Sequence, residues 1–166
     1  MRGYNTRKVC KNKRIYEHER LNQSMLTHKE LESRLPHRDP MLLVGKADKI
    51  ERDGVDIAVG YTEIRGDEWF LQGHFPNNPV VPGVIQCEIL AQTCCMLIEM
   101  DSGTPYFTGM KNVKWRHPVK PGDEFVTECQ IVRKVGSFYQ AKGIGKVGDT
   151  VCVEAEFMFA LVKSEE

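Results

Sequence analysis

The chain has 166 residues and a mass of 19.0 kDa, which fits a single domain. Hydrophobic residues make up 41% and charged residues 28% of the sequence, which excludes collagenous, low-complexity and wholly disordered proteins. The 23 basic side chains equal the 23 acidic ones, so the chain lacks the overall positive charge of a dedicated nucleic-acid-binding protein. We therefore expect one folded domain and no nucleic-acid partner.

The charges are unevenly placed, because residues 1–24 carry seven Lys or Arg and two Glu. Apolar residues are scattered there, so we interpret residues 1–24 as a basic, disordered N-terminal extension and residues 25–166 as the single domain. The extension lacks the apolar segment of a secretory signal, which disfavours export. A second interpretation is that translation starts at Met25 and the extension is an over-long reading frame.

The cysteines are Cys10, Cys87, Cys94, Cys95, Cys129 and Cys152. They lack zinc-site and dithiol spacings and sit mostly in apolar runs, so we expect free buried thiols, a reducing cytoplasm and no metal site. The most apolar segment has an uncharged run of ten residues, 89–98, and a bilayer span needs ~20. The sequence predicts a cytoplasmic protein without a membrane partner.

The first predicted element is a short helix, because Thr27 and Glu30 form a capping box. Leu31 and Leu35 share one of its faces, and Pro36 stops it. Residues 41–52 and 55–59 are then expected to pair as a hairpin around an Asp-Gly turn at 53–54. The following loop, 63–81, is dense in Gly, Asn and Pro, and loops of this length are often functional.

Residues 84–100 form the most unusual segment. Twelve of these 17 residues are Val, Ile, Leu, Ala, Met or Cys, and the only charged residues before Met100 are Glu88 and Glu99. We predict a helix that opens near Pro82 and is surrounded on most sides. Strand patterns follow at 106–115, 124–135, 138–147 and 151–162. Consecutive strands and one apolar helix predict an α+β fold, with an antiparallel sheet that curls around the helix.

Three groups near the start of this helix could act together. Glu88 is a carboxylate in a buried helix and should have a partner, a raised pKa or both. His74 lies in a stiff Pro-rich loop, and a His with a carboxyl group can act as a base and an acid. The N–H of Gly83 at the helix start could bind developing negative charge.

Structural alternatives stay open for each of these residues. His74 could be a structural or solvent-exposed loop residue, and Glu88 could simply bind a nearby backbone amide. We assign His37 and His117 to capping or bracing strand ends. The Cys94–Cys95 pair, which has no base nearby in sequence, is assigned to packing.

Residues 73–92, GHFPNNPVVPGVIQCEILAQ, closely resemble the active-site signature GHFPxxPxxPGVxxxExxAQ of FabZ-type 3-hydroxyacyl-[acyl-carrier-protein] dehydratases. Residues 35–44, LPHRDPMLLV, and 118–123, PVKPGD, are similar to two further elements of that family. Met41 stands where Phe is frequent and Gly45 where Asp is expected. FabA-type dehydratase/isomerases carry Asp in place of Glu88, which makes isomerase activity less expected.

The resemblance implies a hot-dog fold, with an antiparallel sheet wrapped around one long central helix. It also implies a homodimer, commonly three per hexamer, whose active sites take His from one subunit and Glu from the other. His74 would remove the C2 proton of (3R)-3-hydroxyacyl-[acyl-carrier-protein], Glu88 would act as acid or position water, and the Gly83 N–H would hold the thioester oxygen. The product would be the trans-2-enoyl thioester of type II fatty-acid synthesis, made by a lyase without a cofactor.

Further residues are assigned by the same resemblance or by charge. The expected substrate-binding residues are Phe75, Pro82, Val84, Tyr106 and Phe107, the last two either gating a tunnel or only packing. An acidic acyl carrier protein would bind basic side chains, and the candidates are Lys114, Arg116, Lys120, Arg133 and Lys134. The alternative functions are a hot-dog acyl thioesterase and a non-catalytic acyl-chain binding protein.

Overall fold

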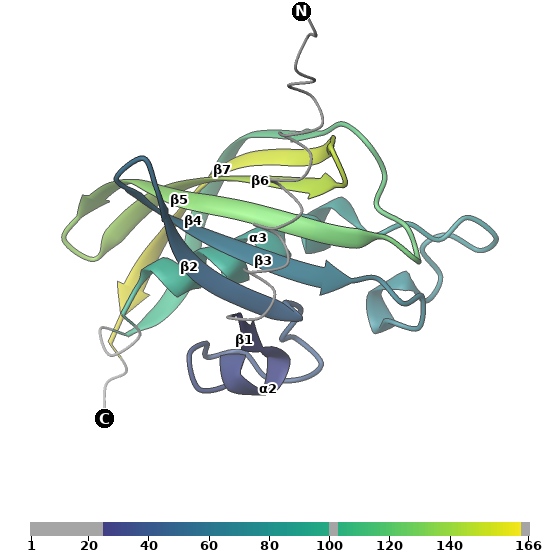
Figure 1. Cartoon of the computed structure of the whole chain (residues 1–166), viewed down its shortest axis with the longest axis horizontal. Helices are drawn as coiled ribbons and strands as arrows, with labels where there is room; N and C mark the ends of the chain where they lie inside the picture. Colours follow the sequence, from purple (N-terminus) through teal and green to yellow (C-terminus); the bar gives the residue numbers. More distant parts are fainter. Residues whose placement is uncertain (1–24, 100–102, 164–166) are drawn as a thin grey trace, which may run out of the picture.

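A computed structural model describes residues 25–99 and 103–163, where a seven-stranded antiparallel sheet curls around a long helix (Figure 1). The expected extension over residues 1–24 lies outside the described residues. The strand order is β1-β2-β3-β5-β6-β7-β4. In chain order the elements are β1 (Leu26–Thr27), α2 (His28–Leu31), β2 (Lys46–Arg52), β3 (Val55–Glu63), α3 (Gly83–Cys94), β4 (Thr104–Trp115), β5 (Glu124–Val135), β6 (Phe138–Val147) and β7 (Thr150–Val162), with 3₁₀ turns at Trp69–Leu71 and Cys95–Leu97. The predicted α+β arrangement is confirmed.

Two-residue turns connect three neighbouring pairs of strands. They lie at 53–54, 136–137 and 148–149, where the sequence has Asp-Gly, Gly-Ser and Gly-Asp. Asp53, Gly54, Gly136 and Gly148 have positive φ, the backbone conformation that such short hairpins require. These turns set the register, and β5 and β6 accordingly have the predicted bounds.

The helix α3 is enclosed, as its composition predicted. It packs against β3, β5, β6 and β7, and its buried side chains are Ile85, Gln86, Cys87, Ile89, Leu90, Gln92, Thr93 and Cys94. Strand β6 approaches so closely that a Cβ on Gly143 would lie 3.0 Å from Leu90 Cδ2 and 2.9 Å from Cys129 Sγ. Five cysteines of the described residues are free and buried, as expected. None of the described helices is long and apolar enough to span a membrane.

The predicted helix over residues 84–100 was too long. Its α-helical part ends at Cys94, a 3₁₀ turn follows, and Ile98 is extended, while Met100 lies outside the described residues. The Thr93 hydroxyl donates to the Ile89 carbonyl at 2.9 Å, a bond type that bends helices. The apolar composition of residues 84–100 does not show that the α-helix ends at Cys94, because the residues after it, in the 3₁₀ turn and at Ile98, are largely buried as well.

The N-terminal predictions also needed correction. The Thr27 N–H donates to Glu30 Oε2 at 2.9 Å, which confirms the capping box, but α2 ends at Leu31. Leu35 lies in the turn that follows, although its N–H still bonds the Leu31 carbonyl at 2.8 Å. Strand β2 begins at Lys46 rather than at residue 41, and the two-residue β1 was not predicted. The residues before β2 are instead bound by side chains.

We expect Leu90→Ala to lower the free energy of unfolding by about 2–5 kcal/mol, the usual cost of a cavity at a fully buried Leu. Val132→Thr, at an exposed position of β5, should change it by less than about 0.5 kcal/mol. Urea unfolding at fixed protein concentration measures both. Equal effects of the two substitutions would contradict the placement of α3 at the centre of the core.

Candidate active site

His74 is held by its own loop, and among the described residues one of its ring nitrogens is bound and the other has no hydrogen-bond partner. Its Nδ1 lies 3.0 Å from the Val80 carbonyl oxygen, and its backbone N–H donates to the Leu71 carbonyl at 3.1 Å. A carbonyl only accepts, so Nδ1 is the donor in this contact, and in the neutral imidazole Nε2 has the lone pair. The ring stacks on Phe75, with 4.1 Å between ring centroids, and the peptide bond joining these two residues is cis. His74 is therefore oriented to accept a proton at Nε2.

Gly83 begins α3 directly after Pro82. The Pro82 carbonyl accepts from the N–H groups of Ile85 and Gln86, at 3.0 and 3.1 Å. Within the described residues, the N–H groups of Gly83 and Val84 have no acceptor, as is usual in the first turn of a helix. Both N–H groups thus remain free to bind an oxygen at the positive end of the helix dipole.

The Glu88 carboxylate projects from α3 with 22% of its side chain exposed. Gln92, one turn later, donates to Glu88 Oε1 at 2.9 Å, and His37 Nε2 lies 3.5 Å from the same oxygen. The partner expected for this enclosed acid is therefore present. Both contacts involve Oε1, so within residues 25–99 and 103–163 Oε2 has no hydrogen-bond or ion-pair partner and is available for a further interaction.

Gln92 also binds the segment before β2. Its Nε2 donates to the Met41 carbonyl at 2.7 Å, and its Oε1 accepts from the Leu43 N–H at 2.8 Å. One buried amide thus connects the carboxylate of Glu88 to a segment about fifty residues earlier in the sequence. These bonds hold residues 42–44, which have no regular secondary structure, against α3.

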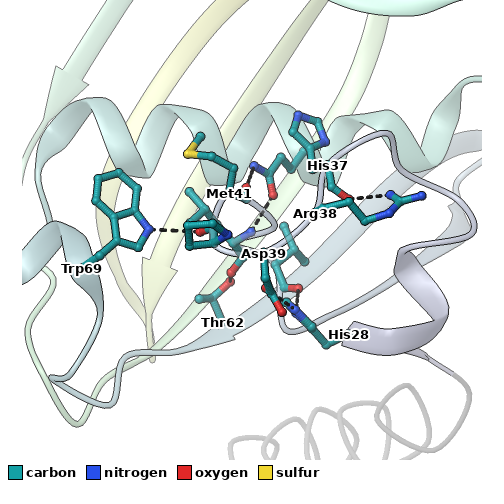
Figure 2. Close-up of polar contacts among 11 residues, drawn as sticks. His28, His37, Arg38, Asp39, Met41, Thr62 and Trp69 are labelled. Atoms are coloured by element: carbon teal, nitrogen blue, oxygen red, sulfur yellow. Dashed lines mark hydrogen bonds and ion pairs between the residues drawn. The ribbon is translucent and has the colours of Figure 1, made fainter.

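Figure 2 shows three further anchors of this segment. The Trp69 indole N–H donates to the Pro40 carbonyl at 3.0 Å. The Thr62 hydroxyl donates to the Leu43 carbonyl at 3.3 Å. The ring nitrogens of His28 lie 3.0 Å from the Val44 carbonyl and 3.0 Å from the Asp39 carboxylate. Side chains from several elements therefore hold the segment of residues 37–44 in place, and His37 is its first residue.

His37 is the site residue that sequence reasoning missed. We assigned it to a strand end, but it lies beside Glu88, in the segment that Gln92 binds. Burial lowers the pKa of His37, the charge of Glu88 partly opposes this shift, and Arg38 adds to it. Neutral His37 with its proton on Nε2 would direct this proton toward Glu88, and its buried Nδ1 has no hydrogen-bond partner in the part of the chain that the structure describes. The sequence signal was its position in a motif shared with the dehydratases.

His117, by contrast, follows β4, and its N–H donates to the Cys152 carbonyl, as expected for a strand end.

The expected substrate-binding residues form two groups. Phe75, Pro82 and Val84 adjoin His74 and Gly83, and Phe75 and Val84 are 56% and 66% exposed. Tyr106 and Phe107 are also exposed, but they lie near the start of β4. Strand β4 is irregular between Phe107 and Trp115, and the stretch of β7 that pairs with it, Val153 to Phe159, advances six residues. At about 3.3 Å per residue, Phe107 therefore lies roughly 20 Å along the sheet from Trp115, which contacts Gly83. Within one chain the two groups are therefore separate.

The basic candidates are also divided. The N–H of Val81 donates to the Val119 carbonyl at 2.8 Å, which places Lys120 and its turn beside the start of α3. Arg116 pairs with Glu154 at 2.8 Å. Arg133 and Lys134 lie near the other end of β5, where Lys134 sits over the Tyr139 ring. Lys114, Arg116 and Lys120 therefore lie near the start of α3, with Lys114 close to the end of β4. Arg133 and Lys134 do not.

A pocket of about 590 Å³ crosses the sheet, and Lys114 is the one expected site residue that it contains. Its lining residues are Ile57, Asn112, Lys114, Glu128, Cys129, Gln130, Lys142, Gly143, Ile144, Glu154, Ala155 and Glu156. Its three glutamates form ion pairs with basic side chains outside the lining, Arg52, Lys111 and Arg116. We interpret it as a solvated sheet face. Among the described residues there is also no cluster of His, Cys, Asp or Glu that could hold a metal ion.

Comparison with known proteins links this arrangement to one family. The FabA-like domain model matches residues 35–156. The 3-hydroxyacyl-[acyl-carrier-protein] dehydratase FabZ of Clostridium novyi is 42% identical over 139 residues, covering 81% of this chain and 96% of that protein. FabZ of Caulobacter vibrioides is 39% identical over 141 residues, covering 81% and 87%. A dehydratase heterocomplex, ApeI:P of Xenorhabdus doucetiae, shares the fold with a TM-score of 0.66 at 18% identity, covering 81% and 91%. The fold is the expected hot-dog fold.

We expect the pKa of His37 to lie below its ordinary value of about 6.5 and to fall further in Glu88→Gln, because the opposing negative charge is lost. Glu99→Gln, at an exposed position, should leave it unchanged. Imidazole proton shifts followed by NMR from pH 4 to 8 measure this pKa. Because the unfolded chain binds this proton more readily, His37 should reduce stability as the pH falls below about 6.5. An unchanged His37 titration in Glu88→Gln would contradict the contact.

Proposed function

The chain belongs to the FabZ-type dehydratases of the FabA-like domain family, and we propose that His74, Glu88 and Gly83 carry out its dehydration reaction. The enzyme is a hydro-lyase that acts on 3-hydroxyacyl-[acyl-carrier-protein] in fatty-acid synthesis. The proposed product is the trans-2-enoyl thioester, formed from the (3R)-hydroxy substrate. The observation that carries the residue assignment is the bond from His74 Nδ1 to the Val80 carbonyl, which leaves Nε2 as a base.

His74 Nε2 removes the C2 proton of the substrate. The thioester makes this proton acidic because the resulting charge spreads to the carbonyl oxygen, so an imidazole is a sufficient base. The ring does not have to reorient, since Val80 and the stacked Phe75 already hold it. As the C2–H bond breaks, its electron pair forms the double bond between C2 and C3.

In the form of the enzyme that reacts, Glu88 carries a proton, and it gives this proton to the C3 hydroxyl group, which leaves as water. Its Oε1 is bound by Gln92 and faced by His37, so we assign the transferred proton to Oε2. The carboxylate that remains is stabilised by the same donors. A return of the proton from His74 to Glu88, directly or through water, restores both groups for the next turnover.

The open N–H of Gly83 stabilises the negative charge that develops on the thioester oxygen. A backbone donor at a helix N-terminus is fixed before the reaction and aligned with the helix dipole. A Cβ at this position would lie 2.6 Å from Trp115 Nε1, so glycine also leaves space where a side chain would clash. Phe75 and Val84 would then bind the apolar part of the substrate beside this donor.

The active enzyme is proposed to be a homodimer joined through β4. In the described residues β4 pairs with β7 alone, and its other edge carries unpaired backbone groups over 12 residues. Tyr106, Phe107, Met110 and Trp115 are exposed on this strand. An antiparallel partner β4 would bring the Phe107 end of one chain toward the Trp115 end of the other, which unites the two groups of substrate-binding residues. Three such dimers would form the expected hexamer.

The carrier protein is proposed to dock beside the start of α3. Lys114, Arg116 and Lys120 surround the turn that Val119 ties to Val81, so positive charge adjoins the groups that bind the thioester. Attraction of an acidic partner by such charges is expected mainly to accelerate association. The second basic pair, Arg133 and Lys134, remains a separate proposal at the far end of β5. The cytoplasm is the proposed compartment, because its reducing conditions suit free thiols.

His74→Ala is expected to lower turnover by about 10²–10⁴-fold, the usual effect of losing a general base. The assay follows the enoyl absorbance of crotonoyl and 3-hydroxybutyryl thioesters together with free thiol. Hydration without thiol release supports the dehydratase, whereas thiol release would indicate a thioesterase and no wild-type turnover an acyl-chain binder. An unchanged rate in His74→Ala would exclude His74 as the base.

Mixing two inactive variants tests whether the site is shared between subunits. In a mixed dimer of His74→Ala and Glu88→Gln, one site contains both substitutions and the other contains neither, provided that each site combines His and Glu from different chains. Equal mixing after subunit exchange should restore about one quarter of wild-type activity, since half of the dimers are mixed and each has one intact site. No recovery, with exchange confirmed by mass spectrometry, would show that both groups act within one chain.

A further inference from the structure

Trp115 connects the free edge strand to the first turn of the central helix. It is the last residue of β4 and pairs with Val153 in β7. Its indole N–H donates to the Gly83 carbonyl at 3.0 Å, although 51% of the residue is exposed. No motif in the sequence assigns a role to Trp115, and the bond places it against the proposed oxyanion donor.

The indole also limits the backbone of Gly83. A Cβ on Gly83 would lie 2.6 Å from Trp115 Nε1 and 2.7 Å from Cε2, so the ring packs directly against the Cα. Glycine has the greatest backbone freedom of any residue, and the N-cap residue, Pro82, makes no side-chain capping bond. The packing of Trp115 therefore restrains the backbone of Gly83, which has no side chain of its own to limit it.

The bonded carbonyl belongs to the peptide unit that contains the Val84 N–H. Donation to this carbonyl fixes the plane of that peptide unit, and hydrogen bonds on the two sides of one amide strengthen each other. The Val81 N–H donates to the Val119 carbonyl at 2.8 Å, so the chain just after β4 anchors the approach to the helix at a second point. The two open N–H groups of the first turn are thus oriented from the end of β4.

We propose that Trp115 is a positioning residue, which holds the first turn of α3 so that its open N–H groups face the thioester oxygen. The indole bond fixes the peptide unit that carries the Val84 N–H, and the ring packing restrains the Cα of Gly83. This inference rests on the proposed function, because it assumes the oxyanion role of Gly83. Since the charge on that oxygen grows only as the C2 proton leaves, Trp115 acts on the transition state more than on substrate binding.

Trp115→Phe tests the role of the indole N–H, because it keeps an aromatic ring and removes the donor. We expect kcat to fall about 10-fold with KM within about twofold, which is less than the 10²–10³-fold effect of removing an oxyanion donor outright. The isotope effect on kcat/KM with substrate deuterated at C2 should increase, because proton removal becomes more rate-limiting. A smaller fraction of folded enzyme would lower kcat without changing this isotope effect.

Trp69→Phe calibrates the structural cost, since it removes a similar 3.0 Å indole bond to a backbone carbonyl from a Trp that is 45% exposed. Thermal melting of both variants shows whether Trp115→Phe loses more stability than this bond accounts for. An unchanged kcat, a rise in KM alone, or a lower kcat with an unchanged isotope effect would overturn the role of Trp115 while leaving the dehydratase assignment intact. Absence of wild-type turnover would overturn the proposed function, and this inference with it.

Discussion

The enclosure of α3 by the sheet places a carboxylate where few protein groups can reach it. A charged group removed from water must recover its hydrogen bonds, or its ionised form becomes unfavourable. Glu88 recovers them from Gln92 on the same helix and faces His37 from the segment before β2. Gln92 in turn is held by the backbone at Met41 and Leu43. One amide thus connects the irregular segment before β2 to the partly exposed acid on α3.

The sequence was most informative where a local rule decides the structure. Tight-turn dipeptides and alternating side chains predicted β5 and β6 correctly, and the near absence of charge predicted that α3 is enclosed. The early end of α3 and the irregular segment before β2 depend on contacts such as those of Thr93 and Gln92, whose partners in the chain cannot be read from order alone. For the same reason the motif around Glu88 was evident while the neighbouring position of His37 was not.

The proposed chemistry draws on side chains that are fixed by different elements. A loop orients His74, the enclosed helix carries Glu88, and the end of the edge strand contacts Gly83. Each group is positioned by a bond to the backbone or by a neighbour that is itself bonded. Such an arrangement lowers the reorganisation required during the reaction, which is the main source of electrostatic stabilisation in enzymes.

The unpaired edge of β4 has a consequence for the life of a newly made chain. A strand of 12 residues with an open row of backbone groups and exposed aromatic side chains can template pairing with any extended polypeptide. Its short counterpart at the opposite border, β1, has only two residues and offers much less. Prompt dimerisation would pair the free edge of β4. The same contact would then both prevent aggregation and complete the proposed active site.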